Sequence, residues 1–257
     1  MSASLAPKLS FQTFKTVDKT VDYASMVKKL SSFQIEKLTF FFKAFFDVNR
    51  DGIVNDSDFR SLTEKLRKIA GWEVDSKDNH AMADVISVFQ ECLLDQVKLE
   101  IGLNQEGLEF RTWEEALRPN KLVVESVTLN QWLNMWAKLC NGAGGIQDFP
   151  IWVQLIPQIM FAVQVGQNKD KIITKECLRH FYENFSGLKD KQLENLTEEG
   201  YSTMTSNGEY ELNAETYDLL FANFLLGRTI YGPGKFIFGC FDNSDLHKKY
   251  KILPVMA

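Results

Sequence analysis

Residues 47–58 contain the clearest chemical pattern in the 257-residue sequence. Oxygen-bearing side chains alternate at the first, third and fifth positions of this stretch, a glycine stands at the sixth, and a carboxylate closes it at the twelfth. In order, these residues are Asp47, Asn49, Asp51, Gly52 and Asp58. Ca²⁺ takes six to eight oxygen ligands, and short carboxylates and amides at this spacing can converge on one point as the chain curls. The spacing is that of an EF-hand calcium loop.

The inner residues of this loop each suit one task. Gly52 permits a sharp turn with positive φ, which a Cβ would penalise. Beyond it, the backbone carbonyl of Ile53 can face the ion. Val54 points the other way, into the core, where it can pair with the matching residue of a second loop. Asn55 is suited to hold a coordinating water.

The twelfth position departs from the common pattern, because Asp58 stands where a bidentate glutamate is usual. A carboxylate that is one methylene shorter must draw the following helix inward or coordinate through one oxygen. We therefore expect weaker Ca²⁺ binding and more tolerance of Mg²⁺, which prefers six ligands.

Apolar residues at helical spacing flank the loop on both sides. Those before it are Leu38, Phe41, Phe42 and Phe45, and those after it are Phe59, Leu62, Leu66 and Ile69. Each set marks one face of a helix. Ser31 with Gln34 predicts a capping box at the start, and Gly71 predicts a C-terminal stop. The alternative, an acidic surface turn between two helices, does not explain five matching loop positions with the right helices on both sides.

The same hydrophobic frame recurs three more times along the chain. Each unit has a helical pattern, a short β-like triplet and a second helical pattern, and the triplets are residues 126–128, 172–174 and 211–213. The aliphatic residues at position eight are then Val54, Val127, Ile173 and Leu212, spaced by 73, 46 and 39 residues. The first spacing is about thirty residues longer than a plain pair of repeats allows, which predicts an insertion over residues 98–125.

The ligand positions of these three further loops are poor. The second loop would offer Leu122 and Val124, which carry no side-chain oxygen. The third has Lys171 in the place of glycine and Cys177 at its twelfth position, and a thiol does not replace a hard carboxylate. The fourth has one carboxylate and ends at Thr216. The chain is therefore predicted to keep one working site.

These patterns predict an all-α EF-hand fold of four helix–loop–helix units in two pairs, with tiny β pairings between the loops. The first pair spans residues 31–141, and the second, with both loops degenerate, spans residues 146–230. Residues 1–30 are predicted to form an N-terminal arm. Residues 231–257 are predicted to form a C-terminal tail that packs on the core.

Beyond the loop itself, three segments are similar to a known family. They are the phenylalanine-rich lead-in at residues 40–46, residues 132–137 and residues 234–239. The sequence resembles the invertebrate sarcoplasmic calcium-binding proteins, and within them it is most similar to the calexcitins. The likeness spans roughly residues 32–242.

This resemblance implies a compact fold of two EF-hand pairs packed face to face, in a protein that binds Ca²⁺ and often Mg²⁺. It implies a cytosolic buffer or, for a calexcitin, a neuronal signalling protein. The ligands carried over to this chain are Asp47, Asn49, Asp51, Ile53 through its carbonyl, and Asp58. Family members usually keep more than one working site, so the single site expected here weakens the buffering role.

Twenty phenylalanines and five tryptophans leave a second hypothesis open. They could line a cavity for a small apolar ligand, as in the coelenterate photoproteins and luciferin-binding proteins, whose closed fold of four EF-hands resembles this one. His180 or His247 could then contact the ligand, although each is more simply a solvent-facing or satisfied histidine. Aromatic residues at helical spacing are more often plain core, but the loss of metal sites beside a retained aromatic frame favours such a carrier.

Composition and missing motifs limit the other function classes. A net charge of −5 argues against general nucleic-acid binding, which needs a basic surface. The sequence has no run of 18 apolar residues to span a membrane and no N-terminal apolar run typical of a signal peptide. Four scattered cysteines are typical of a reducing compartment. Without a GxSxG, HExxH, P-loop or kinase signature, we expect a protein without enzymatic activity. We also expect it to be cytoplasmic and monomeric. Its expected partners are Ca²⁺ and either a target protein or an apolar small molecule.

Overall fold

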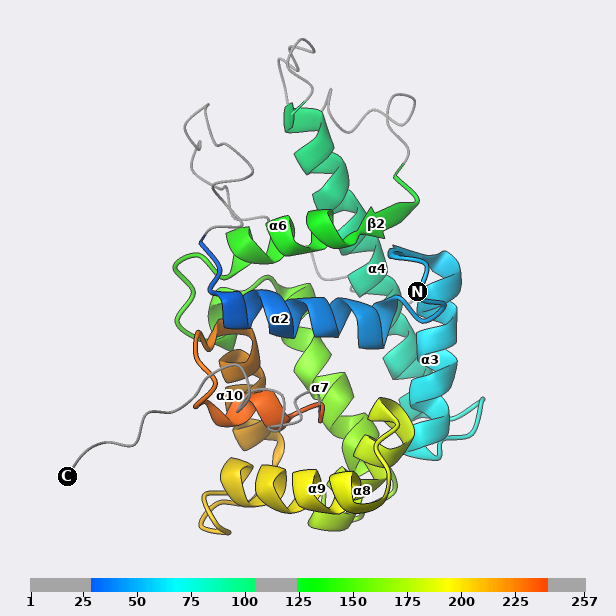
Figure 1. The fold of residues 1–257 in the computed structure, drawn as a ribbon. Helices are drawn as coiled ribbons and strands as arrows, with labels where there is room; N and C mark the ends of the chain where they lie inside the picture. Colours follow the sequence, from blue (N-terminus) through cyan, green and yellow to red (C-terminus); the bar gives the residue numbers. More distant parts are fainter. Residues whose placement is uncertain (1–28, 105–123, 240–257) are drawn as a thin grey trace, which may run out of the picture.

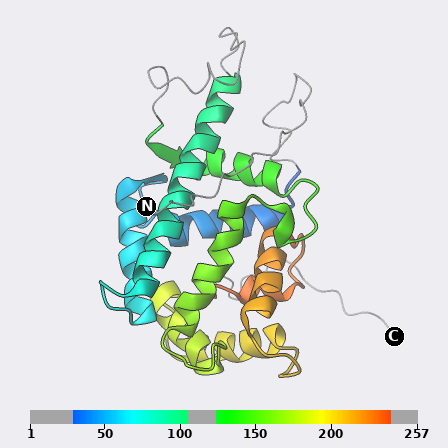
Figure 2. The ribbon, with the colours of Figure 1, turned by 180° about the vertical axis from the view of Figure 1, so that it is seen from behind.

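The computed structural model describes residues 29–104 and 124–239, and Figures 1 and 2 show them from opposite sides. The first half contains α2 (Ser32–Phe41), the π-helical turn η1 (Phe42–Phe46), β1 (Ile53–Asn55), α3 (Asp56–Ala70), α4 (Lys77–Asn104), β2 (Ser126–Thr128) and α6 (Leu129–Leu139). The second half contains the 3-10 turn η2 (Ile146–Asp148), α7 (Ile151–Val165), α8 (Lys175–Phe181), the π-helical turn η3 (Tyr182–Ser186), α9 (Asp190–Met204), α10 (Ala214–Leu226) and the 3-10 turn η4 (Pro233–Phe236).

The first helix–loop–helix unit has the helix ends that the sequence predicts. At the start of α2, Ser31 Oγ accepts the Gln34 N–H at 3.2 Å, and Gln34 Oε1 accepts the Ser31 N–H at 3.0 Å. α2 passes directly into η1, which ends where the predicted loop begins. α3 ends at Gly71, whose φ of 67° is left-handed. The predicted capping box and C-terminal stop are confirmed.

Backbone pairings join the loops two by two. β1 and β2 are antiparallel, with Val54 opposite Val127, and both side chains are at most 1% exposed. In the second half, the N–H of Ile173 donates to the carbonyl of Leu212 at 2.9 Å. The aliphatic residues that the sequence places at position eight therefore meet in pairs. The predicted all-α EF-hand fold with small β pairings is confirmed.

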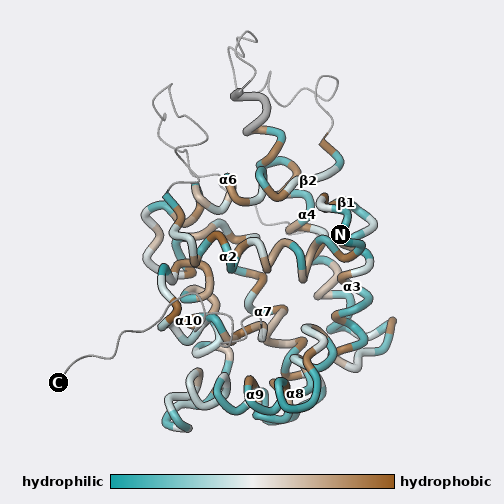
Figure 3. The backbone as a smooth tube through the Cα atoms, in the orientation of Figure 1, coloured by the Kyte–Doolittle hydropathy of each residue, from teal (hydrophilic) through white to brown (hydrophobic). Residues whose placement is uncertain are grey.

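An aromatic core joins the two halves, with Phe41 among its most buried members. The Phe41 ring contacts Trp132 and Phe224 edge to face, each with ring centroids 5.6 Å apart. It also stacks on Phe238, which lies beyond α10 and is fully buried. In Figure 1, α2 accordingly crosses the molecule between α6 and α9, and Figure 3 shows hydrophilic residues gathered on the outer helices α3 and α9. α2 therefore contacts both halves and leads through η1 into the loop at residues 47–58.

Parts of three predicted segments lie outside the described residues. They are residues 1–28 of the arm, 105–123 of the insertion and 240–257 of the tail, which includes His247. α4 continues to Asn104 and so occupies the first residues of the predicted insertion. Among the helices that the structure describes, none is long and apolar enough to cross a membrane.

Candidate metal centre

The ends of the loop at residues 47–58 are held by two different helical elements. η1 ends directly before Asp47, and Asp58 lies in the first turn of α3. Between them the backbone reverses direction with positive φ at Arg50 (62°) and Gly52 (87°). Glycine adopts that conformation without the steric penalty that a Cβ brings. The sharp turn therefore lies where the sequence predicts it.

Both end carboxylates are buried, since Asp47 is 3% exposed and Asp58 is 1% exposed. One Asp58 oxygen accepts the Asn55 N–H at 3.0 Å, and the other accepts the Asn49 N–H at 3.4 Å. One Asp47 oxygen accepts the Gly52 N–H at 3.2 Å. The loop backbone thus replaces part of the water that each carboxylate loses on burial.

The second oxygen of Asp47, Oδ1, is buried without a hydrogen-bond partner in the part of the chain that the structure describes. A buried carboxylate oxygen in that state is costly, because it has lost water and gained no donor. Hard divalent cations take carboxylate, amide and carbonyl oxygens as ligands. The oxygen donors of this loop fit such a cation, and Asp47 Oδ1 is an oxygen that a cation would satisfy.

Asn49 and Asp51 are exposed and hydrogen-bonded within the loop. Asn49 Oδ1 accepts the Asp51 N–H and Asp51 Oδ1 accepts the Ile53 N–H, both at 2.9 Å. Asn49 Nδ2 also donates to Asp51 Oδ2 at 3.0 Å. Across residues 29–104 and 124–239, no three His, Cys, Asp or Glu side chains are gathered into a group that could hold a metal. Asn49 and Asp51 must therefore exchange their mutual hydrogen bond for the ion before all five predicted ligands can act together.

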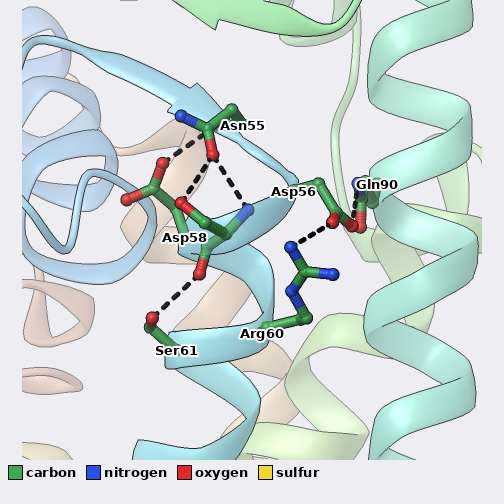
Figure 4. Close-up of polar contacts among 7 residues, drawn as sticks. Asn55, Asp56, Asp58, Arg60, Ser61 and Gln90 are labelled. Atoms are coloured by element: carbon green, nitrogen blue, oxygen red, sulfur yellow. Dashed lines mark hydrogen bonds and ion pairs between the residues drawn. The ribbon is translucent and has the colours of Figure 1, made fainter.

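Figure 4 shows the polar contacts at the exit of the loop. Asn55 caps α3 by accepting the Ser57 N–H at 2.8 Å. Asp56 pairs with Arg60 at 2.7 Å and accepts a hydrogen bond from Gln90 of α4 at 3.2 Å. The sequence predicts a water-holding role for Asn55 and no role for Gln90. Spacing gives no signal for Gln90, because its partner lies 34 residues away.

The third loop has the backbone of a metal loop with different side chains. Lys171, in the place of glycine, has a φ of 51°. Asn168 Oδ1 accepts the Asp170 N–H at 3.1 Å. The first loop contains the same turn, in which Asn49 Oδ1 accepts the Asp51 N–H. Cys177, at the twelfth position, accepts a hydrogen bond from the Thr174 hydroxyl at 3.4 Å. A thiol is a poor ligand for Ca²⁺, so a single working loop remains the prediction.

The interior beside the loop contains an apolar cavity of about 30 Å³. Phenylalanines of α2 and η1 and apolar residues of α3, α4 and α7 line it. Pockets for small-molecule ligands usually have volumes of about 300–1,000 Å³, so this cavity is far too small for a ligand of many atoms. His180 Nε2 lies 3.1 Å from the Ile69 carbonyl, as expected of a histidine that is satisfied by the protein rather than by a ligand.

Comparisons with known proteins agree with the fold. No protein-family model matches the chain. Two groups of sarcoplasmic calcium-binding proteins from Branchiostoma lanceolatum (II, V, VI and VII; I, III and IV) match 160 residues at 25% and 24% identity, which is 61% of this chain and 72% of each relative. The solved structure of a sarcoplasmic calcium-binding protein from amphioxus has a TM-score of 0.62 and 20% identity, covering 83% of this chain and 100% of that chain. The chain is similar to the sarcoplasmic calcium-binding proteins and has their fold.

The predicted resemblance to the sarcoplasmic calcium-binding proteins is thereby confirmed, and the narrower resemblance to the calexcitins stays a prediction. The solved structure of coelenterazine-binding protein from Renilla muelleri matches with a TM-score of 0.48 and 11% identity. That likeness is too distant to support the carrier hypothesis. The five predicted ligands also stay a prediction, because these comparisons concern sequence and fold.

Proposed function

We propose that this chain is a calcium-binding EF-hand protein with one working site at residues 47–58. The proposed ligands are Asp47, Asn49, Asp51, the carbonyl of Ile53, and Asp58. The observation that carries the proposal is Asp47 Oδ1, a buried carboxylate oxygen without a hydrogen-bond partner among the described residues. The relatives, which are named for calcium binding, support the choice of ion.

The proposed role of each acidic side chain follows from the element that holds it. Asp47 comes from the end of η1 and Asp58 from the first turn of α3, so an ion held by both links two helical elements. Asp51 adds a third negative charge at the exposed tip. A bound Ca²⁺ would neutralise part of the negative charge of these three carboxylates. Because Asp58 is one methylene shorter than glutamate, Mg²⁺ is proposed as an alternative ion at the same site.

One site favours a signalling role over bulk buffering. We therefore propose a cytoplasmic, monomeric Ca²⁺ sensor of the calexcitin type, without enzymatic activity, in which the position of α3 reports metal binding to a target protein. The alternative, a carrier of a small apolar ligand, is less well supported. The cavity beside Phe41 has a volume of about 30 Å³, far below that of a pocket for a bound organic molecule.

Calorimetric titration of the metal-stripped protein with CaCl₂, with and without millimolar MgCl₂, tests this proposal. We expect one site with a dissociation constant of about 1 µM or lower, the range of sensor sites, and weaker apparent Ca²⁺ binding when Mg²⁺ is present. Asp47→Ala and Asp58→Ala should each abolish this binding. Binding that keeps its stoichiometry in both variants, or no binding by the folded wild-type protein, contradicts the proposal.

A further inference from the structure

The cavity of about 30 Å³ lies between the two elements that hold the ends of the proposed metal loop. Phe45 and Phe46 of η1 line one side, and Leu62 and Leu66 of α3 line another. All four side chains are at most 5% exposed. Val85 of α4 also lines the cavity and is partly exposed. A shift of α3 toward η1 would therefore reduce this space.

The hydrogen-bonded contacts of α3 and its C-cap with the second half lie at residues 65–71, in the C-terminal half of the helix. Gln167 Nε2 donates to the Gly71 carbonyl at 2.8 Å, and His180 Nε2 lies 3.1 Å from the Ile69 carbonyl. Lys65 Nζ donates to the Phe185 carbonyl at 3.0 Å. With these anchors in place, a tilt of α3 displaces its first turn, which carries Asp58, more than its last turn.

The short side chain at the twelfth position supplies a reason for such a tilt. Aspartate lacks one carbon–carbon bond of glutamate, a length of about 1.5 Å. For Asp58 to reach an ion that Asp47 also holds, the first turn of α3 must approach η1. Mg²⁺ requires ligand distances of about 2.0–2.1 Å, compared with about 2.3–2.6 Å for Ca²⁺, so it requires the closer approach.

We propose that the apolar cavity beneath α3 sets the preference of the loop between Mg²⁺ and Ca²⁺, with Val85 as a specificity-determining residue outside the ligand set. The cavity leaves α3 room to approach η1, and a smaller cavity stops that approach earlier. This inference rests on the proposed function, because it requires that the loop bind a divalent cation.

Val85→Leu tests the inference by adding one methylene to a side chain that lines the cavity. We expect Mg²⁺ affinity to fall about tenfold and Ca²⁺ affinity about threefold or less. The added methylene hinders the approach of α3 to η1, and Mg²⁺ requires a closer approach than Ca²⁺ does. Val88→Leu is the matched control. Val88 lies on the same helix, is 42% exposed and does not line the cavity, so its variant should bind both ions as the wild type does.

Val85→Leu and Val88→Leu in an Asp58→Glu background test whether the effect of Val85→Leu depends on the approach of α3 to η1. Glutamate reaches the ion without the approach of α3, so Val85→Leu should then leave the ratio of the two affinities unchanged. Thermal unfolding in EDTA checks that each variant folds. If Val85→Leu does not fold, Val85→Ile places the same additional methylene on a β-branched side chain.

The outcomes distinguish the inference from the proposed function. An unchanged affinity ratio in Val85→Leu, or an equal change in the Asp58 and Asp58→Glu backgrounds, overturns the inference while the calcium site stands. Absence of any metal binding by the folded wild-type protein overturns the proposed function and this inference together.

Discussion

Asp47→Asn is the substitution whose effect follows most directly from the structure of the loop. It keeps the size of the side chain and an oxygen that can accept the Gly52 N–H. It replaces the other oxygen, which is buried without a hydrogen-bond partner among the described residues, by an amide nitrogen. It also removes one negative charge from a loop that contains Asp51 and Asp58. We therefore expect opposite effects on the metal-free and the calcium-bound protein.

The metal-free and calcium-bound states should change in stability by different amounts. Asp47→Asn keeps a buried polar atom at this place but removes its negative charge, and a buried charge costs more than a buried neutral polar group, so the metal-free variant should unfold at the same temperature as the wild type or higher. A site with a dissociation constant of about 1 µM adds about 4 kcal/mol of stability at 1 mM Ca²⁺. For a chain of 257 residues, that corresponds to an increase in melting temperature of roughly 10 °C. The variant should lose this increase.

Differential scanning calorimetry in EDTA and in 1 mM CaCl₂ measures both effects. Asp170→Asn is the matched control, because Asp170 occupies the fifth position of the third loop and is exposed. It should keep the full calcium-dependent increase. An Asp47→Asn variant that melts well below the wild type in EDTA, yet keeps the calcium-dependent increase, would show that the carboxylate is structural and refute the reasoning.

Two further predictions concern the core and the thiols. Phe41→Ala should lower the free energy of unfolding by about 3–5 kcal/mol, measured in urea, because Phe41 is fully buried between both halves of the aromatic core; a loss below about 1 kcal/mol would contradict its central place. Burial raises the pKa of the Cys140 thiol to about 12, against the partial opposing effect of Lys37. The folded state then keeps a proton that the unfolded thiol loses near pH 8.5, so this group makes stability fall as the pH rises from about 9 to about 12. Cys140→Ala should flatten that part of the stability profile, and an unchanged slope would count against the shift.

The features that the sequence predicts correctly depend on local spacing or on a repeated frame. The turn at Gly52 and the cap at Ser31 need only neighbouring residues, so their residue types suffice. The pairing of Val54 with Val127 spans the insertion. It was still predictable, because each loop has the same order of apolar helix, triplet and apolar helix.

The contacts that the sequence does not predict join distant segments. Lys37 is 1% exposed, although a lysine is usually exposed. Its Nζ donates to the Gly227 carbonyl at 2.7 Å and lies 5.5 Å from the Phe224 ring centroid. Only the docking of α2 on the end of α10 creates these contacts. The hydrogen bond between Asp56 and Gln90 is of the same kind, because each residue alone is typical of a solvated helix.

The residues of the proposed site follow from the sequence, whereas their hydrogen bonds in the metal-free loop do not. The five proposed ligands lie in one loop, as their spacing requires. The hydrogen bond from Asn49 Nδ2 to Asp51 Oδ2 was not predictable, because it depends on side-chain orientation within an exposed turn. Spacing alone therefore does not reveal that Asn49 and Asp51 must give up this hydrogen bond before both can bind an ion.

Anomalous diffraction from crystals grown with CaCl₂ tests the central claim most directly, because calcium scatters anomalously at long wavelength and the ligands can be read from the map. We predict an anomalous peak within the loop at residues 47–58, coordinated by Asp47, Asn49, Asp51, the Ile53 carbonyl and Asp58. A peak in the third loop instead, or a well-ordered first loop without a peak at saturating CaCl₂, would contradict the account.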